Sequence, residues 1–115
     1  AGSMKVELLY FDGCPNWLVA EDRLRQALDL AGCGGTQVER VLVSTPDEAK
    51  RRQFRGSPTV LVDGHDPFAD PAAPVGLSCR LYRDGGRLAG APPLAELVEA
   101  VRRAVTPVPE DPRGG

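Results

Sequence analysis

Cys14 is the residue of this sequence that is best placed to do chemistry. It stands in Phe-Asp-Gly-Cys-Pro-Asn-Trp at 11–17, where an apolar run gives way to helical periodicity. Pro15 suits a first helical position, because it has no N–H to leave unpaired and its φ angle is already helical. The sulfur would therefore lie at the positive end of a helix dipole, which favours a thiolate. This position predicts a reactive thiol, against the plainer alternative of a small buried side chain.

The other two cysteines limit the reactions open to Cys14. Trp17 occupies the position where a Cys-x-x-Cys motif has its second thiol, so no local disulfide can form. Cys33 lies at the far end of the expected helix, roughly 28 Å away at 1.5 Å per residue, and cannot pair with Cys14; we expect it to be a turn residue without a chemical role. Cys79 is a redox partner of Cys14 if the chain returns to the same rim of the sheet, and otherwise an inert buried cysteine. Both alternatives remain open at this stage.

The segments that must position these cysteines alternate between strands and helices. Apolar or β-branched runs predict strands at 5–11, 37–43, 59–64 and 79–82, with a short hairpin partner at 87–90. Apolar residues at steps of three and four predict helices at 15–32 and 92–105, and cap and charge signals predict a short polar helix near 44–54. The order is therefore βαβαββα, with an irregular insertion, rich in Pro and Asp, near 65–78.

Length and composition exclude several classes of function. The chain has 115 residues, enough for one domain with its own core at 4–105, and its net charge of −2 disfavours nucleic acid as a partner. No apolar run approaches the roughly 20 residues of a membrane span and no signal peptide is visible, so we expect a cytoplasmic protein. Residues 1–3 resemble a tag remnant, and the composition of 106–115 predicts a disordered tail.

The order of elements, with a cysteine at the first strand-to-helix junction and a proline before the third strand, resembles the thioredoxin/glutaredoxin superfamily over residues 4–105. More narrowly, the segments 10–16, 56–59, 62–64 and 76–82 are similar to small bacterial thioredoxin-like proteins that are sometimes labelled alkylmercury lyase-like. The resemblance implies a thioredoxin-like fold, with a mixed four-stranded sheet flanked by helices.

The resemblance also implies roles for particular residues. Cys14 would be the nucleophile, and a cis peptide before Pro58 would turn the backbone of Ser57 toward its sulfur. There Ser57 could pair with an extended peptide or with the cysteinyl part of a small thiol. Thr59, Pro15 and Trp17 would border the same substrate groove, although an aromatic residue on the core stripe of a helix also suits plain packing.

Three functions are compatible with these residues. The first is thiol–disulfide exchange through a single active-site cysteine, in which Cys79 can resolve and a low-molecular-weight thiol or a protein thiol or disulfide is the partner. The second is binding or cleavage of a soft metal or organomercurial species by Cys14 and Cys79, with Asp12 as the adjacent proton donor. The third is a binding module that keeps the groove without turnover.

Two further expectations concern charge and metals. Arg55 and the helix start favour a Cys14 thiolate, whereas Asp12 opposes it. We expect no cofactor and no resident metal, because the insertion's acidic residues and histidine lack a recognised ligand spacing and are expected to belong to a solvated loop; they are Asp63, His65, Asp66 and Asp70.

Overall fold

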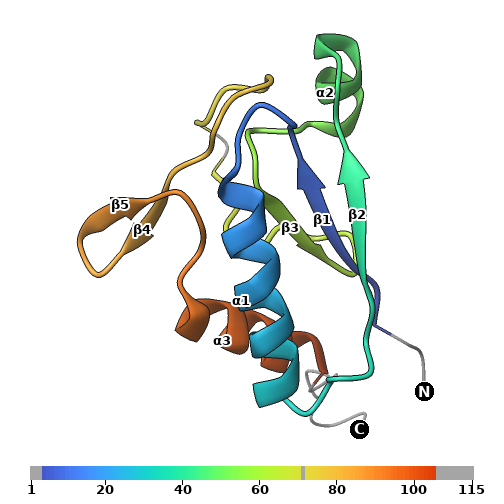
Figure 1. Cartoon of the computed structure of the whole chain (residues 1–115), viewed down its shortest axis with the longest axis vertical. Coiled ribbons are helices and arrows are strands. Elements are labelled where there is room, and N and C mark those ends of the chain that lie inside the picture. The colour runs from blue at the N-terminus through green and yellow to red at the C-terminus, as the bar shows by residue number, and fades with distance from the viewer. Residues whose placement is uncertain (1–3, 71, 106–115) are drawn as a thin grey trace, which may run out of the picture.

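A three-stranded sheet lies at the centre of the chain, which we describe from a computed structural model over residues 4–70 and 72–105. Within these ranges the chain forms one α/β domain, with three helices, the mixed sheet and a separate β-hairpin (Figure 1). The expected tag remnant at 1–3 and the expected disordered tail at 106–115 lie outside the described residues. None of the helices in the described ranges has the length and apolar character that a membrane span requires.

Strand β1 (Val6–Tyr10) is the middle strand of the sheet. It pairs in parallel with β2 (Val38–Leu42) and antiparallel with β3 (Thr59–Val62). Successive residues of a strand point to opposite faces. Leu8 accordingly joins the core on one face of the sheet, and Leu9 joins a second core on the other. The long apolar run at the start of the sequence is therefore buried on both sides, as its composition predicts.

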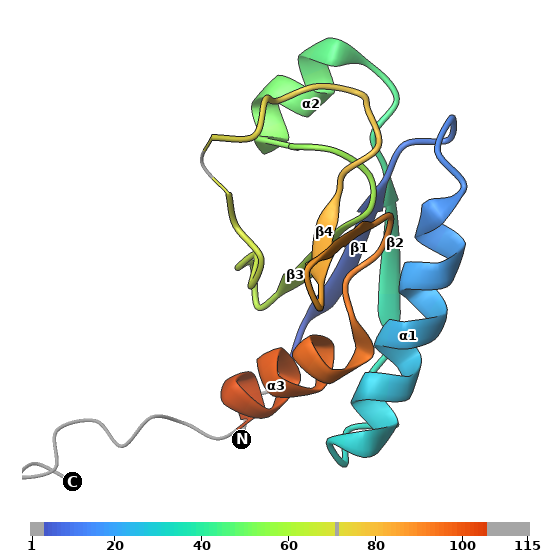
Figure 2. The same ribbon diagram turned by 90° about the vertical axis from the view of Figure 1, so that its left-hand side faces the viewer.

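Helices cover the two faces of the sheet unequally. The first core packs helix α1 (Asn16–Leu30) and helix α3 (Leu94–Val105) against β1 and β3. The second core packs Phe54 and the short helix α2 (Pro46–Arg52) against the opposite face. Figure 2 shows α1 on one side of the sheet, with α2 and the insertion on the other. The end of the sheet at which β1 leads into α1 lies between α1 and the insertion. We call this end the rim of the sheet.

The junction of β1 and α1 has nearly the predicted form. Pro15 is the N-cap residue of α1, one position before the first helical residue, and its backbone is already in the right-handed helical region. Cys14 precedes it, and its N–H donates to the carbonyl oxygen of Phe11 at 3.0 Å. At the other end, Gly32 adopts a φ of +80°, which permits the chain to turn back toward β2.

The expected four-stranded sheet is wrong. Among the described strands, β4 (Tyr82–Asp84) pairs with β5 (Arg87–Ala89) alone, in a hairpin that turns at two glycines with positive φ. Residues 79–81, which we expected to begin a strand beside β3, instead meet the chain just before β3 through a single parallel bridge between Ser57 and Cys79. The insertion is the reason. It runs back along the sheet after β3, and at its far end the N–H of Gly76 donates to the carbonyl oxygen of Phe54 at 3.0 Å.

An ion pair connects α1 to the edge strand β2. Glu21, whose side chain is 11% exposed, accepts hydrogen bonds from Nε and Nη2 of Arg40, the latter at 2.7 Å. The Arg40 guanidinium also lies 5.1 Å from the centre of the Trp17 ring. Hydrogen bonding to Arg40 lowers the pKa of Glu21 below its ordinary value of 4.5, although partial burial opposes this shift.

This ion pair gives a pH-dependent prediction. Because the pKa of Glu21 is lowered in the folded protein, its contribution to stability is complete above pH 4.5 and is lost as the pH falls through the lowered value. Glu21→Gln should therefore be less stable than the wild type at pH 7, and the difference should vanish in strong acid. Urea denaturation across this pH range measures the effect, with the exposed Glu99→Gln as control. A difference that persists unchanged into strong acid would contradict the assignment.

Candidate functional site

Cys14 and Cys79 form a disulfide across the rim of the sheet. Their Cα atoms are 5.7 Å apart, within the usual range for bonded cysteines, although 65 positions separate them in the sequence. Cys79 reaches this place because the insertion carries the chain back to the end of the sheet where α1 begins. The expectation that Cys79 is buried is therefore wrong, since the residue is exposed and is bonded to Cys14. Cys33, at the other end of α1, is the free cysteine.

Ser57 holds the segment that carries Cys79. Its N–H donates to the carbonyl oxygen of Ser78 at 2.7 Å, and its own carbonyl oxygen accepts from the N–H of Arg80 at 2.8 Å. The same carbonyl oxygen lies 3.7 Å from Sγ of Cys14. The peptide between Ser57 and Pro58 is cis, as expected. In this oxidised state, residues 78–80 of the chain itself occupy the backbone positions that we expected an external peptide to use.

The hydroxyl of Ser57 is an exception in an otherwise well-paired site. The residue is fully buried, and Oγ has no hydrogen-bond partner among the residues that the structure describes. A buried hydroxyl without a partner costs roughly 1–3 kcal/mol. The site thus keeps an unused donor on the residue that contacts the Cys14 sulfur.

Arg80 anchors the same segment through its side chain, a role that the sequence analysis missed. Its side chain is 6% exposed, and its guanidinium pairs with Asp66 at 2.7 Å. It also donates to Oγ1 of Thr59 at 3.2 Å and to the carbonyl oxygen of Phe68, and it lies 4.7 Å from the centre of the Tyr82 ring. Asp66, which we expected in a solvated loop, is therefore half-buried in an ion pair.

Tyr82 adds a further attachment between this segment and the backbone at the cis peptide of Ser57 and Pro58. Its hydroxyl donates to the carbonyl oxygen of Pro58, and its ring meets Phe68 edge to face with centroids 5.4 Å apart. Burial raises the pKa of Tyr82, so the hydroxyl keeps its proton and remains a donor. Along 79–82 the structure exposes Cys79 and Leu81 and buries Arg80 and Tyr82. Apolar and charged residue types predict the opposite burial for Leu81 and Arg80, so no local signal in the sequence marks Arg80 as an anchor.

The other residues expected at the site lie in different roles. Trp17 packs against Tyr10, with ring centroids 4.5 Å apart, and belongs to the first core. Oγ1 of Thr59 donates to the carbonyl oxygen of Gly56 at 2.7 Å and is buried beneath the Arg80 side chain. Pro15 is exposed beside Cys14.

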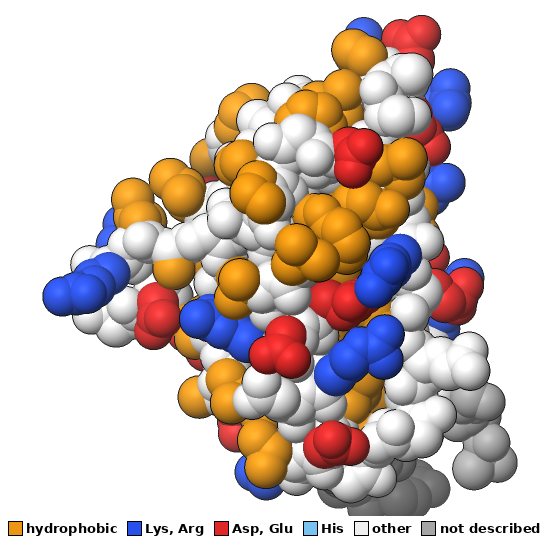
Figure 3. All heavy atoms as spheres, viewed as in Figure 1, with side chains coloured by type: hydrophobic (Ala, Val, Ile, Leu, Met, Phe, Trp, Pro, Cys, Tyr) orange, Lys and Arg blue, Asp and Glu red, His pale blue; other side chains and the backbone are white. Residues whose placement is uncertain are grey.

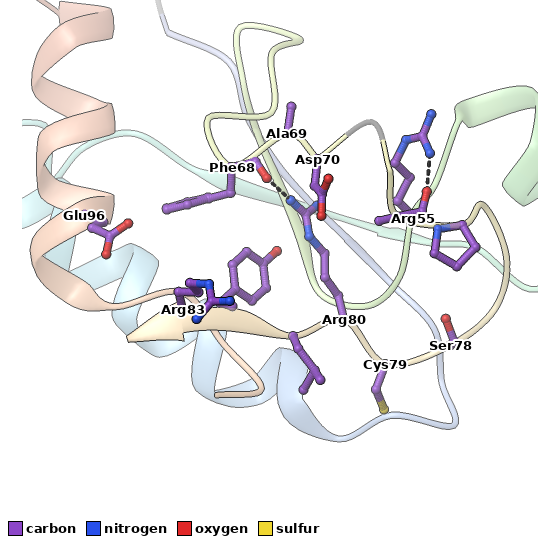
Figure 4. A pocket seen from close by; sticks show the side chains of 13 residues that line it. Arg55, Phe68, Ala69, Asp70, Ser78, Cys79, Arg80, Arg83 and Glu96 are labelled. Atoms are coloured by element: carbon purple, nitrogen blue, oxygen red, sulfur yellow. Dashed lines mark hydrogen bonds between the residues drawn. The ribbon is translucent and has the colours of Figure 1, made fainter. Parts of the chain in front are cut away.

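The surface around the disulfide is apolar on one side and charged on the other. Leu18, Leu81 and Leu88 are each more than half exposed, and Figure 3 shows hydrophobic side chains gathered over the first turns of α1 and along the hairpin. On the other side, a cavity of about 500 Å³ lies between the insertion and residues 78–83. Arg55 and Arg83 line this cavity, and Figure 4 shows the Cys79 side chain pointing away from them.

The site therefore consists of one disulfide, the backbone of Ser57 and the anchors of residues 78–82. No group of three or more His, Cys, Asp or Glu side chains that could hold a metal ion gathers in the described ranges. Comparison of the chain with protein-family models, with curated proteins and with solved structures gave no match. The functional proposal thus rests on the geometry of the site itself.

Thiol counting tests the connectivity of the cysteines. The denatured, unreduced protein should react with one equivalent of a maleimide, at Cys33, and the reduced protein with three. Cys33→Ser should give zero and two equivalents. Peptide mapping that joins Cys33 to either of the other cysteines would contradict the structure.

The unpaired hydroxyl of Ser57 gives a prediction with an unusual sign. Ser57→Ala removes a buried donor that has no partner, so the oxidised protein should become more stable by about 1 kcal/mol. The exposed Ser78→Ala is the matched control and should change stability by less than about 0.5 kcal/mol. Chemical denaturation under non-reducing conditions measures both variants. A loss of stability in Ser57→Ala would show that the hydroxyl is satisfied in solution.

Proposed function

We propose that this chain is a thioredoxin-like thiol protein that catalyses thiol–disulfide exchange through Cys14 and Cys79. The observation that carries the proposal is the meeting of these cysteines, from segments 65 positions apart, on the backbone of Ser57. Cys79 supplies the second thiol that Trp17 excludes from the local motif. The cytoplasmic placement belongs to the same proposal, because disulfides in reducing compartments are typically transient and catalytic.

The surroundings of Cys14 suit a leaving thiolate. The residue immediately precedes the N-cap of α1, where the first N–H groups of a helix lack acceptors within it and carry partial positive charge. The first turn of α1 contains no acidic residue that would offset this charge. A thiolate that is stabilised in this way leaves a disulfide faster than an ordinary one.

Accessibility decides which sulfur an external thiol attacks. Cys14 is fully buried in the oxidised protein, whereas Cys79 is exposed. An incoming thiolate therefore attacks the sulfur of Cys79, forms a new S–S bond there, and expels Cys14 as a thiolate. A second thiolate then attacks the external sulfur of the mixed disulfide and releases Cys79. Two external thiols are oxidised to one disulfide, and the protein disulfide is reduced by two electrons.

The same steps in reverse oxidise the protein. The Cys79 thiolate attacks an external disulfide, and Cys14 then resolves the mixed disulfide by attacking Cys79. In this scheme the two cysteines exchange the roles that the resemblance implies, because burial places Cys14 behind Cys79. A low-molecular-weight thiol and a protein thiol are both compatible substrates.

Convergence of the two sulfurs also favours a second candidate function, which is binding of a soft metal ion. The Cα atoms are 5.7 Å apart in the disulfide-bonded form, so after reduction the two thiolates could chelate a two-coordinate ion such as mercury. Cleavage of an organomercurial would need a proton donor as well, and Asp12, two positions before Cys14, is exposed to solvent. We place this function second because the sulfurs are joined to one another in the structure.

An exchange assay with serine variants tests the proposed function. The wild type and Cys33→Ser should catalyse the reduction of an internal disulfide in a protein substrate by excess thiol, and both should do so at the same rate. Cys14→Ser and Cys79→Ser should each lose at least about 100-fold of this activity, because each leaves only half of the cycle. Full activity in either variant would refute the two-cysteine cycle. Tight binding of Hg²⁺ by a wild type without exchange activity would favour the second function.

Trapping the intermediate tests the order of attack. When the oxidised protein is mixed with excess glutathione and quenched early with an alkylating reagent, mass spectrometry should find glutathione on Cys79 and the alkyl group on Cys14. Cys33→Ser simplifies the reading, because it removes the other thiol. The opposite labelling pattern would show that the buried sulfur is attacked first.

A further inference from the structure

We propose that Arg80 is a positioning residue that keeps Cys79 beside Cys14 when the disulfide between them is open. The inference rests on the proposed function, since it concerns the reduced half of the exchange cycle. Without a bond between the sulfurs, non-covalent contacts alone decide how often the two thiols meet. Arg80 is the residue next to Cys79, and its backbone and side chain both hold that segment in place.

The side chain of Arg80 joins two parts of the chain that flank the cysteine segment. Asp66 and the carbonyl oxygen of Phe68 bind it from the insertion, and Oγ1 of Thr59 binds it from the start of β3. The ion pair is well shielded, because the Arg80 side chain is 6% exposed and that of Asp66 is 18% exposed. Figure 4 shows the guanidinium beneath Phe68 at the centre of the pocket, on the opposite side of the segment from the Cys79 sulfur.

The backbone of Arg80 is equally constrained. Its N–H donates to Ser57, and its Cα lies so close to Gly56 that a Cβ on that glycine would come within 2.8 Å of the Arg80 Cβ. Gly56 also has a φ of +117°, a region that favours glycine. The backbone of residue 80 therefore packs directly against that of residue 56, which leaves no room for a side chain between them.

None of these contacts uses a sulfur atom, so reduction breaks none of them directly. Each one favours the arrangement in which the disulfide can form again. By thermodynamic linkage, contacts that hold Cys79 near Cys14 raise the equilibrium constant for disulfide formation, and the disulfide in turn strengthens the contacts. Weakening the attachment at Arg80 must then make the disulfide easier to reduce.

The test compares disulfide stability in matched arginine variants. Wild type, Arg80→Met and Arg83→Met are equilibrated with a series of glutathione redox buffers, and the fraction of disulfide is read by alkylation and mass spectrometry. Arg83 is an exposed arginine three positions later and serves as the control. Arg80→Met should lower the equilibrium constant at least tenfold, equal to a shift of about 30 mV, and Arg83→Met should stay within twofold of the wild type.

Asp66→Asn is the second variant, and it keeps the test decisive if Arg80→Met does not fold. It removes the charge partner but leaves Arg80 and the backbone contacts, so it should lower the equilibrium constant in the same direction by a smaller factor. Circular dichroism of each reduced variant confirms that the fold is present. Wild-type equilibrium constants in folded Arg80→Met or Asp66→Asn would overturn the inference. A wild type that forms no disulfide at any buffer ratio would refute the proposed function, and the role of Arg80 with it.

Discussion

The backbone of Ser57 is the point on which the site depends. Its N–H donates to the carbonyl oxygen of Ser78, and its carbonyl oxygen accepts from the N–H of Arg80 and lies 3.7 Å from the Cys14 sulfur. Two segments that are remote in sequence are thus brought to one peptide unit. Once residues 78–80 are paired with Ser57, the bond between Cys14 and Cys79 closes a much shorter effective loop. Forming that bond then costs less chain entropy.

This arrangement explains why the sheet stops at three strands. If a fourth strand followed β3 directly and paired antiparallel with it, that strand would begin at the end of the sheet remote from Cys14. The insertion instead carries the chain back to the opposite rim, where residues 78–80 run parallel to the approach of β3. As a result, β4 does not pair with β3, and the hairpin of β4 and β5 projects from the domain (Figure 1). The same path of the chain brings the exposed Cys79 to the buried Cys14, just before α1.

Local patterns were enough to predict most of the elements and the location of Cys14 between β1 and α1. The apolar run of β1, the helical periodicity after Pro15 and the turn before Thr59 each depend on neighbouring residues, and the structure has these elements within one or two positions of their expected bounds. The number of strands in the sheet could not be predicted in this way, because it depends on the path of the insertion. The same holds for Arg80, whose partners Asp66 and Thr59 are 14 and 21 positions away.

The central claim is that the disulfide between Cys14 and Cys79 opens and closes reversibly rather than serving as a permanent cross-link. A redox titration of the wild-type protein against dithiothreitol and glutathione tests it most directly. The account predicts a single reversible two-electron transition with a midpoint above about −300 mV, in which both thiols appear together. A disulfide that stays closed well below that potential would be a structural bond, and this result would contradict the account.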